Sequence, residues 1–353
     1  MPLIIPMFIV HQGCPHRCIY CNEEKAVGDY PARITEASLR ETVYSYLRNS
    51  RGKKGPVQIA FYGGNFTGMD RDYQRELLEM AGTFIRQGQA GGIRISARPD
   101  GIDETCLDFL ESFSVKTVEI GAQSMVDDVL RLSRRGHTAA DVRRAVGLLK
   151  RRGFETGMHL MAGLPGDSAA GFACTVEETI ALRPDTVRVH PTLIFSGTEL
   201  AELFYRGEYR PLTMPEAIAA GKYALNKFTA AGITVIRLGL QTTPEMEKAG
   251  SIVAGPFHPA FRALVEEAIF FDMAAFLLAG LDVSGREVTF FVSPHDSSSF
   301  RGQKNGNLRA IKRQFSLKQL QVAVAAEQPR GALAVDLEGK RWRLTREDFL
   351  NNG

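Results

Sequence analysis

The chain has 353 residues, of which 44% are hydrophobic and 24% are charged, and its formal net charge is +3. This composition is typical of a folded globular protein and excludes a disordered chain. No apolar run reaches the roughly 20 residues that span a bilayer, and the first residues lack the basic segment of a signal peptide. We therefore expect a cytoplasmic protein with no membrane contact. The small net charge gives no indication about nucleic acid.

Short apolar runs alternate with longer helical patterns along the first 200 residues. Six runs have the near-continuous hydrophobicity of strands buried on both faces: Ile4–Val10, Val57–Tyr62, Ile93–Ala97, Thr117–Gly121, Thr156–Ala162 and Val187–Leu193. The helical patterns between them include Glu36–Arg48, Asp70–Gln87, Ala139–Arg152 and Ala169–Leu182. This alternation predicts an α/β fold, a partial (β/α)6 TIM-like barrel, with Thr234–Leu238 as a candidate seventh strand.

Three cysteines follow the first predicted strand in C-x3-C-x2-C spacing: Cys14, Cys18 and Cys21. Three thiolates can hold three irons of a [4Fe-4S] cluster and leave the fourth iron open, whereas an electron-transfer cluster normally takes four cysteines. A structural zinc site with His11 or His16 as fourth ligand is the alternative, although such sites usually come from paired C-x2-C knuckles.

Five cysteines are too few, and odd in number, for a disulfide framework. The other two, Cys106 and Cys174, lie in helical patterns. We expect them to be small buried hydrophobic residues.

Glycine and polar residues mark the ends of the predicted strands. The segments concerned are 13–22, 62–67, 96–100, 121–124 and 159–166. In parallel α/β folds the active site forms on the loops that follow the strands. Glycine and proline punctuate any strand end, so a single loop of this kind is uninformative. Five in series, beginning with the cysteine motif, predict one site.

The cysteine motif, with Tyr20 directly before its last cysteine, resembles the radical S-adenosylmethionine (SAM) superfamily. The resemblance implies that Cys14, Cys18 and Cys21 hold a [4Fe-4S] cluster and that SAM binds at its open iron. It further implies that an external one-electron donor reduces the cluster. Cleavage of SAM would then give methionine and a 5'-deoxyadenosyl radical, which abstracts hydrogen from a substrate.

The same resemblance assigns the contacts with SAM. Gly63 and Gly64 stand where the family carries Gly-Gly-Glu and would approach the amino group, because no Cβ intrudes there. Asn65 replaces the glutamate and keeps a carbonyl acceptor. The other predicted contacts are Tyr20 near the adenine, Gln123 to the ribose, Arg135 to the carboxylate or a ribose hydroxyl, and His159, which stands where coproporphyrinogen oxidases carry an aspartate, to the ribose.

A narrower resemblance covers roughly residues 5 to 240. It is to the radical SAM half of the elongator catalytic subunit, a family that acts on the wobble uridine of transfer RNA. The ordered segments that carry it are 97–100, 119–124, 135–138, 163–166, 183–193, 197–200 and 205–209. The elongator subunit has a longer insertion in its cysteine motif and a C-terminal acetyltransferase domain. This chain has neither the length nor an evident acetyl-CoA loop for such a domain.

We expect residues 1–240 to form the radical SAM core and residues 241–353 a small α+β domain that binds RNA or the substrate. The pattern in the second part predicts a helix at Pro259–Leu278, strands at Glu287–Val292 and Leu320–Ala325, and a final hairpin. A glycine-bearing basic loop that leads into a helix suits phosphate and weakly resembles the KH family of RNA-binding modules. The candidate RNA contacts are Arg301, Lys304, Arg309, Lys312 and Arg313. A solvated basic helix is the alternative.

The sequence therefore predicts a radical SAM enzyme that modifies an RNA resembling transfer RNA. Two alternatives stay open. One is a radical SAM oxidoreductase acting on a small molecule or tetrapyrrole, and the other is a non-enzymatic iron-sulfur regulator that binds RNA. No side chain is assigned as a catalytic acid or base, and the oligomeric state is not predicted.

Overall fold

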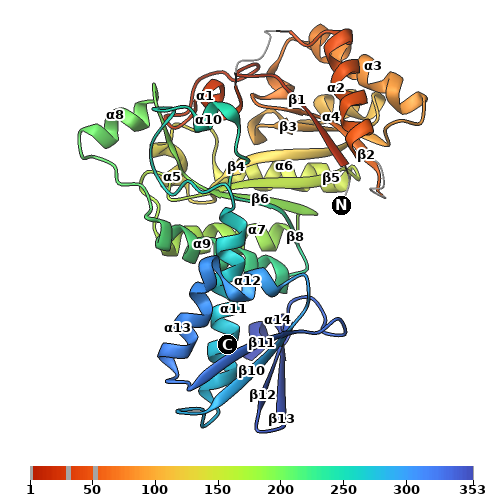
Figure 1. Ribbon diagram of the computed structural model, residues 1–353. Helices are drawn as coiled ribbons and strands as arrows, with labels where there is room; N and C mark the ends of the chain where they lie inside the picture. The colour runs from red at the N-terminus through yellow and green to blue at the C-terminus, as the bar shows by residue number, and fades with distance from the viewer. Residues whose placement is uncertain (1–2, 29–32, 51–54, 353) are drawn as a thin grey trace. The chain divides into compact units, whose positions relative to one another are not determined.

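A curled sheet of seven parallel strands forms the centre of the fold (Figure 1). The computed structural model describes residues 3–28, 33–50 and 55–352. The strand order is β1-β2-β3-β4-β5-β6-β8, so the strands follow one another in chain order across the sheet. The strands are β1 (Leu3–Phe8), β2 (Val57–Tyr62), β3 (Gly92–Ala97), β4 (Val115–Gln123), β5 (Glu155–Ala162), β6 (Thr186–Pro191) and β8 (Thr234–Leu238). The predicted partial barrel is confirmed, and Thr234–Leu238 is its seventh strand.

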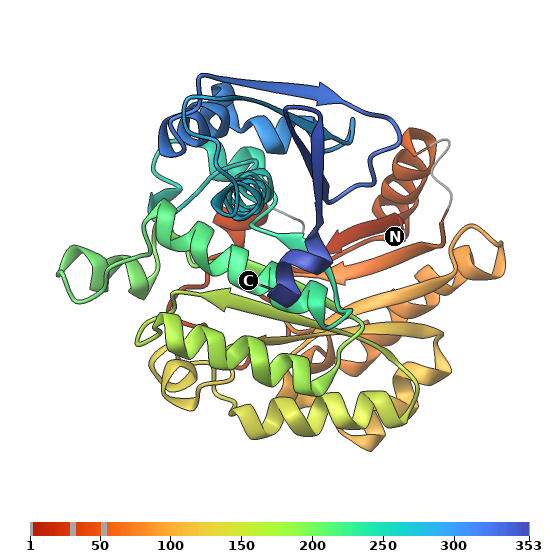
Figure 2. The same ribbon diagram turned by 90° about the horizontal axis from the view of Figure 1, so that it is seen from below.

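Helices alternate with these strands and lie along the outer face of the sheet (Figure 2). Several begin at a residue whose side chain accepts a backbone N–H of the first turn, as Thr35, Asp70 and Thr138 do. The helices are α1 (Glu23–Val27), α2 (Glu36–Asn49), α3 (Arg71–Arg86), α4 (Glu104–Ser112), α5 (Asp127–Leu132), α6 (Ala139–Arg151), α7 (Ala169–Leu182), α8 (Glu199–Tyr205), α9 (Met214–Ala230) and α10 (Pro244–Glu247). The short strands β7 (Ile194–Phe195) and β9 (Ile252–Ala254) pair separately.

The two faces of the sheet differ in chemistry. Outward residues such as Val118 and Ile120 are fully buried together with helix residues such as Leu107 and Val142. The inner face instead carries charged residues, and Arg94 is only 1% exposed. Burial of hydrocarbon against the helices fixes the position of each strand. The buried charges on the other side must be paired.

One carboxylate pairs two of these buried charges. Glu119 on β4 accepts from Arg94 of β3 at 2.6 Å and from Arg188 of β6 at 2.9 Å, and Tyr62 of β2 donates to it at 2.9 Å. Arg94 also donates to Gln58 at 2.9 Å and lies 3.4 Å from Glu155. This network joins five of the seven strands from inside the curve.

A second compact unit comprises Ile218–Gly232 and His258–Gly353, whereas Met1–Ala217 and Ile233–Phe257 form the first. The second unit contains a four-stranded mixed sheet in the order β11-β10-β12-β13. Its elements, besides most of α9, are α11 (Phe261–Ala279), β10 (Glu287–Val292), α12 (Ser297–Arg301), α13 (Gly306–Gln314), β11 (Gln319–Val324), β12 (Ala332–Leu337), β13 (Lys340–Thr345) and α14 (Arg346–Asn352). This is the predicted α+β pattern. The functional boundary at residue 240 stays a prediction.

Aromatic contacts hold the second unit together. The ring of Phe300 on α12 lies 4.9 Å from that of Phe290 on β10 and 6.5 Å from that of Phe270 on α11. An ion pair of 2.5 Å between Lys222 and Asp272 joins α9 to α11. These contacts connect the helices of the unit to its sheet.

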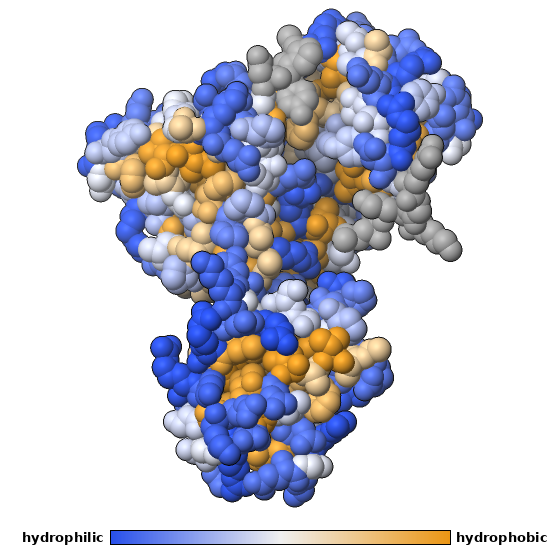
Figure 3. Space-filling model, in the orientation of Figure 1, coloured by the Kyte–Doolittle hydropathy of each residue, from blue (hydrophilic) through white to orange (hydrophobic). Residues whose placement is uncertain are grey.

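The surface is largely hydrophilic. In Figure 3, apolar colour gathers around the α5 and α8 segments of the first unit and over a broad area of the second unit. Leu132 at the end of α5 and Tyr205 at the end of α8 are large exposed apolar residues. Among residues 3–28, 33–50 and 55–352, no helix has both the length and the apolar character needed to cross a bilayer.

The shared carboxylate of Glu119 gives a test of the fold. Glu119→Gln leaves the Arg188 guanidinium without its counter-charge and leaves buried Arg94 with only the more distant Glu155, so we expect the free energy of unfolding to fall by about 3–5 kcal/mol. Anaerobic urea denaturation measures this change. Glu178→Gln, which removes an exposed pair with Arg143, is the matched control and should cost less than about 1 kcal/mol. Equal effects of the two substitutions would contradict this role of the network.

Candidate functional site

The cysteine loop, residues 13–22, begins five residues after the end of β1 and packs against the loop that follows β2. Gly13 has a φ of +70°, and a Cβ at this position would overlap the backbone oxygen of Asn65. Cys14 is exposed, Cys18 is buried and Cys21 is intermediate. The three predicted ligands therefore lie on one loop whose backbone is fixed by its neighbour.

The three thiols influence one another. Burial, Glu23 and Cys18 raise the pKa of Cys14 to about 11. Burial, Glu23 and the other two thiols also raise the pKa of Cys21. In the part of the chain that the structure describes, no three His, Cys, Asp or Glu side chains already surround a common metal position. A [4Fe-4S] cluster makes a different demand, because each of its three thiolates binds a different iron and must lose its proton.

Gly63 and Gly64 both have positive φ, +74° and +66°. A Cβ on Gly64 would overlap the backbone oxygen of Gln12, so only glycine fits there. The backbone N–H of Gly64 donates to the carboxylate of Glu23, and so does the N–H of His11. One carboxylate thus joins the loop after β1 to the loop after β2.

Asn65 connects the loops that follow β1, β2 and β3. Its side-chain nitrogen donates to the Gly13 oxygen at 2.9 Å, and its side-chain oxygen accepts from the Arg98 N–H and the Thr67 hydroxyl, both at 3.0 Å. An amide oxygen has two lone pairs, and both are used. The prediction that Asn65 contacts SAM stays a prediction, but this geometry does not favour it.

Arg135 lies beside the cysteine loop and is 8% exposed. Its Nη1 donates to the Cys18 sulfur at 3.1 Å and its Nη2 to the Gly121 oxygen at 2.6 Å. Burial alone would lower the pKa of Arg135, but Tyr20 and Cys18 raise it above its ordinary value. A guanidinium that stays charged beside three thiols suits an anionic centre.

Three predicted site residues carry buried polar atoms with no hydrogen-bond partner among the described residues. They are the Tyr20 hydroxyl, the Gln123 side-chain oxygen and the Arg135 Nε. Gln123 also has a φ of +65°, which is uncommon for a residue other than glycine. Both Gln123 and Arg135 lie against Gly121. Orphaned buried polar atoms require a partner, so this donor and acceptor set fits a polar ligand such as SAM.

His159 lies on the inner face of the sheet, with its ring 4.5 Å from that of His190. Burial is the main cause that lowers the pKa of His159, followed by His190 and Arg188. Burial lowers the pKa of His190 to about 4. Both imidazoles are therefore neutral near pH 7 and can donate or accept hydrogen bonds there.

The sequence interpretation did not identify Glu23 or His190. Glu23 follows the last cysteine of the motif by two residues and opens α1, which is a signal for an acidic group at the cluster. Cys174 was expected to be buried, and this was wrong. The buried side of α7 is formed by Phe172, Thr175, Val176 and Thr179, and Cys174 is exposed.

The candidate RNA contacts gather in the second unit. The loop between α12 and α13 has positive φ at Gly302, Lys304 and Asn305. It follows strand β10 and one short helix and leads into α13. Four of the five basic residues, Lys304, Arg309, Lys312 and Arg313, are exposed, and Arg301 is intermediate. The predicted basic, glycine-bearing loop at a helix start therefore forms.

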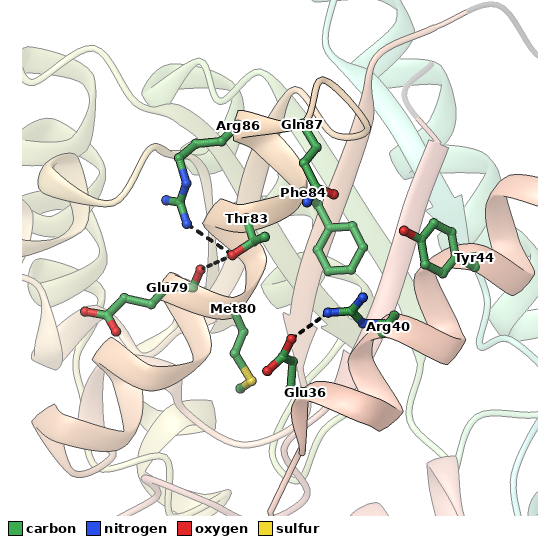
Figure 4. A pocket seen from close by; sticks show the side chains of 9 residues that line it. All are labelled: Glu36, Arg40, Tyr44, Glu79, Met80, Thr83, Phe84, Arg86 and Gln87. Atoms are coloured by element: carbon green, nitrogen blue, oxygen red, sulfur yellow. Dashed lines mark hydrogen bonds and ion pairs between the residues drawn. The ribbon is translucent and has the colours of Figure 1, made fainter.

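A surface pocket lies elsewhere, between α2 and α3 (Figure 4). Arg40 donates to Glu36 at 2.6 Å at its wall, and Arg86 donates to Thr83 at 3.1 Å. None of the predicted site residues lines it. The strand ends therefore remain the candidate site.

Two family models match this chain. The radical SAM superfamily model matches residues 8–178, and the model of the radical SAM C-terminal domain matches residues 184–270. The chain belongs to the radical SAM superfamily. It is a radical SAM enzyme, and the cofactors of this superfamily are a [4Fe-4S] cluster and SAM.

Several curated relatives are named for work on transfer RNA. The tRNA uridine(34) acetyltransferase of Methanocaldococcus infernus is 26% identical over 249 residues, covering 60% of this chain and 47% of that protein. Elongator complex protein 3 of Mus musculus is 35% identical over 133 residues, covering 36% of this chain and 24% of that protein. The chain thus spans about half the length, or less, of these relatives.

A solved structure shares the fold. It is the archaeal Elp3 of Methanocaldococcus infernus with an N-terminal deletion. The TM-score is 0.57 at 21% identity, and the match covers 76% of this chain and 62% of that one. At this identity the likeness supports the fold and says nothing of the substrate.

Proposed function

We propose that this chain reductively cleaves SAM at a [4Fe-4S] cluster and uses the resulting radical to modify an RNA resembling transfer RNA. The observation that carries the first part is the loop of Cys14, Cys18 and Cys21 with the Arg135 guanidinium against it. When bound, the cluster supplies the electron that breaks a carbon-sulfur bond of SAM to give methionine and a 5'-deoxyadenosyl radical. An external one-electron donor is therefore required, and a reducing compartment such as the cytoplasm suits both cluster and thiols.

The chain's own residues hold and orient the two cofactors in this proposal. Cys14, Cys18 and Cys21 bind three irons, and Arg135 neutralises part of the negative charge of the thiolates. The orphaned Tyr20 hydroxyl and Gln123 oxygen offer hydrogen bonds to the adenosine part of SAM. His159, neutral near pH 7, offers a hydrogen bond to the ribose without adding charge.

We assign the amino group of SAM to Glu23 together with Gly63 and Gly64. The Glu23 carboxylate lies 3.7 Å from the position of a Cβ on Gly63 and accepts the N–H of Gly64. An amino group that binds the open iron through its lone pair still has two N–H hydrogens, and these need a carboxylate or carbonyl acceptor. The loop of Gly63 and Gly64 has Asn65 where the family has a glutamate. Glu23, two residues after the last cysteine of the motif, supplies a carboxylate in its place.

Two observations support an RNA substrate. Relatives named as tRNA uridine(34) acetyltransferases match more than half of this chain. The second unit also offers four exposed basic residues: Lys304 in the loop before α13, Arg309 within the helix, and Lys312 and Arg313 in its last turn. Exposed backbone N–H groups and lysine or arginine side chains are the usual partners of phosphate.

Formation of 5'-deoxyadenosine tests the cleavage reaction. Alanine in place of Cys14, Cys18 or Cys21 removes a ligand of the cluster, so the product should fall to background in anaerobic assays with dithionite. Cys174→Ala changes an exposed cysteine outside the motif and should keep both iron content and product. A triple variant that still binds the cluster and forms product would overturn the proposal.

SAM binding tests the assignment of Glu23. Glu23→Gln removes the charge but keeps an acceptor, so we expect the dissociation constant of SAM for the cluster-loaded protein to rise about tenfold. Equilibrium dialysis measures it without turnover. The neighbouring exposed Glu24 provides the control, because Glu24→Gln should leave the constant unchanged. Unchanged binding in both variants would remove Glu23 from the site.

The salt dependence of RNA binding tests the substrate. Neutralising Lys304, Arg309, Lys312 and Arg313 should weaken binding of a tRNA transcript and reduce the logarithmic salt slope by about 0.7–0.9 for each phosphate that the variant no longer neutralises. The control neutralises four exposed arginines of the first unit, Arg48, Arg131, Arg144 and Arg151. RNA crosslinking in cells should decrease only in the first variant. Equal crosslinking in both variants would contradict the proposal that these four basic residues of the second unit bind RNA.

A further inference from the structure

A row of three basic or ionisable side chains crosses the inner face of the sheet. His159 on β5 is the cross-strand partner of Arg188 on β6, and Arg188 is the partner of Arg237 on β8. Neighbouring strands are about 4.8 Å apart, so each step along this row is short. Directly paired residues of adjacent strands point to the same face.

A β-bulge sets the last step of this row. Val187 pairs with Val235, but Arg188 pairs with Arg237, so Ile236 is the extra residue. Without the bulge, Ile236 would face Arg188 from the neighbouring strand. Bulges often re-aim a side chain beside an active site. Here the bulge brings Arg237 to the inner face.

The charges on this inner face do not balance. The guanidiniums of Arg94 and Arg188 share the carboxylate of Glu119, and Glu155 lies 3.4 Å from Arg94. Among the residues that the structure describes, Arg237 forms no ion pair or side-chain hydrogen bond with a carboxylate. Three guanidiniums therefore face two carboxylates. A partly buried cation without a counter-charge is costly.

Arg237 remains accessible to a ligand. Its side chain is intermediate in exposure, and the Arg188 side chain is 18% exposed. Burial lowers the pKa of Arg237, and the neighbouring Arg188 lowers it further. An anion bound between the guanidiniums of Arg188 and Arg237 would offset both the cost of burying the Arg237 charge and the repulsion between the two arginines.

The row also leads toward the cofactor site. His159 is influenced electrostatically by Arg135, which touches the cysteine loop, and by Arg188 and Arg237 on the other side. In the sheet order β4-β5-β6-β8, His159 on β5 lies between Gly121 of β4, whose oxygen Arg135 contacts, and Arg237 on β8. A ligand anchored at Arg237 could extend across His159 toward the cofactors.

We propose that Arg237, with the accessible part of Arg188, binds an oxyanion group of the substrate and so positions the substrate for attack by the radical. This inference rests on the proposed function. An arginine pair recognises phosphate or carboxylate by charge-assisted hydrogen bonds. A backbone phosphate of RNA is the source that the proposed substrate favours, and a small carboxylic acid is the other source.

Binding of simple probes to the cluster-loaded protein with SAM tests the site. We expect uridine monophosphate to bind, and Arg237→Gln to weaken it at least about tenfold, as expected when one charge-assisted hydrogen bond is removed. Arg237→Lys should retain part of this affinity. Arg151→Gln, which removes an exposed charge on α6, is the control and should change nothing. Uridine, which lacks the phosphate, should not distinguish the variants.

Glutarate identifies the source of the oxyanion. Arg237-dependent binding of glutarate in preference to uridine monophosphate would support the site and assign it to a carboxylic acid. Probe binding that is absent, or equal in wild type and Arg237→Gln, would overturn the proposal. If Arg237→Gln does not fold, phenylglyoxal modification of wild-type Arg237 replaces it, and bound probe should slow this modification, whereas equal rates overturn the site.

Substrate-free formation of 5'-deoxyadenosine, measured on the same samples, separates the two proposals. If 5'-deoxyadenosine forms but no probe binding depends on Arg237, only the oxyanion site is contradicted. If probe binding depends on Arg237 but no 5'-deoxyadenosine forms, the cleavage reaction is contradicted and the oxyanion site is supported.

Discussion

The close approach of two backbone loops determines where the cofactors can bind. Gly13 of the cysteine loop and Gly64 of the loop after β2 leave no room for a Cβ, because each lies against the backbone of the other loop. Asn65 completes this contact by bonding to Gly13 and to Arg98. The position of the three cysteines is therefore set by the ends of β1, β2 and β3 together. The proposed sites for the cluster, SAM and the substrate all depend on this arrangement.

The inner face of the sheet links the stability of the fold to its function. Glu119 pairs the guanidiniums of buried Arg94 and partly buried Arg188, and this holds the strands beneath the site. The same face also carries His159, which is neutral, and Arg237, which has no carboxylate partner among the described residues. Arg237 lies on β8, at one end of the row formed by His159, Arg188 and Arg237. A barrel interior filled with hydrocarbon would pack as well but could not bind a polar substrate. The excess positive charge is thus better explained by a ligand than by packing.

The order of strands and helices followed from the sequence because each strand is a short apolar run and each helix has its own period and cap. Val57–Tyr62, Glu287–Val292 and Ala169–Leu182 have the predicted bounds. The site was harder to predict. Cysteine spacing is local and visible, whereas the roles of Glu23, Asn65 and Arg237 depend on contacts between loops and on a bulge. Neither leaves a periodic signal, so only the three-dimensional structure relates them to the cysteines.

We propose that the three cysteines leave one iron of the cluster open and that SAM binds to that iron. Electron-nuclear double resonance of the reduced, cluster-loaded protein, with SAM carrying nitrogen-15 at its amino group, tests this claim directly. We expect a nitrogen-15 coupling to the cluster spin, which the same spectrum of unlabelled SAM would lack. A reduced [4Fe-4S] signal without such a coupling, although SAM is bound, would contradict the account.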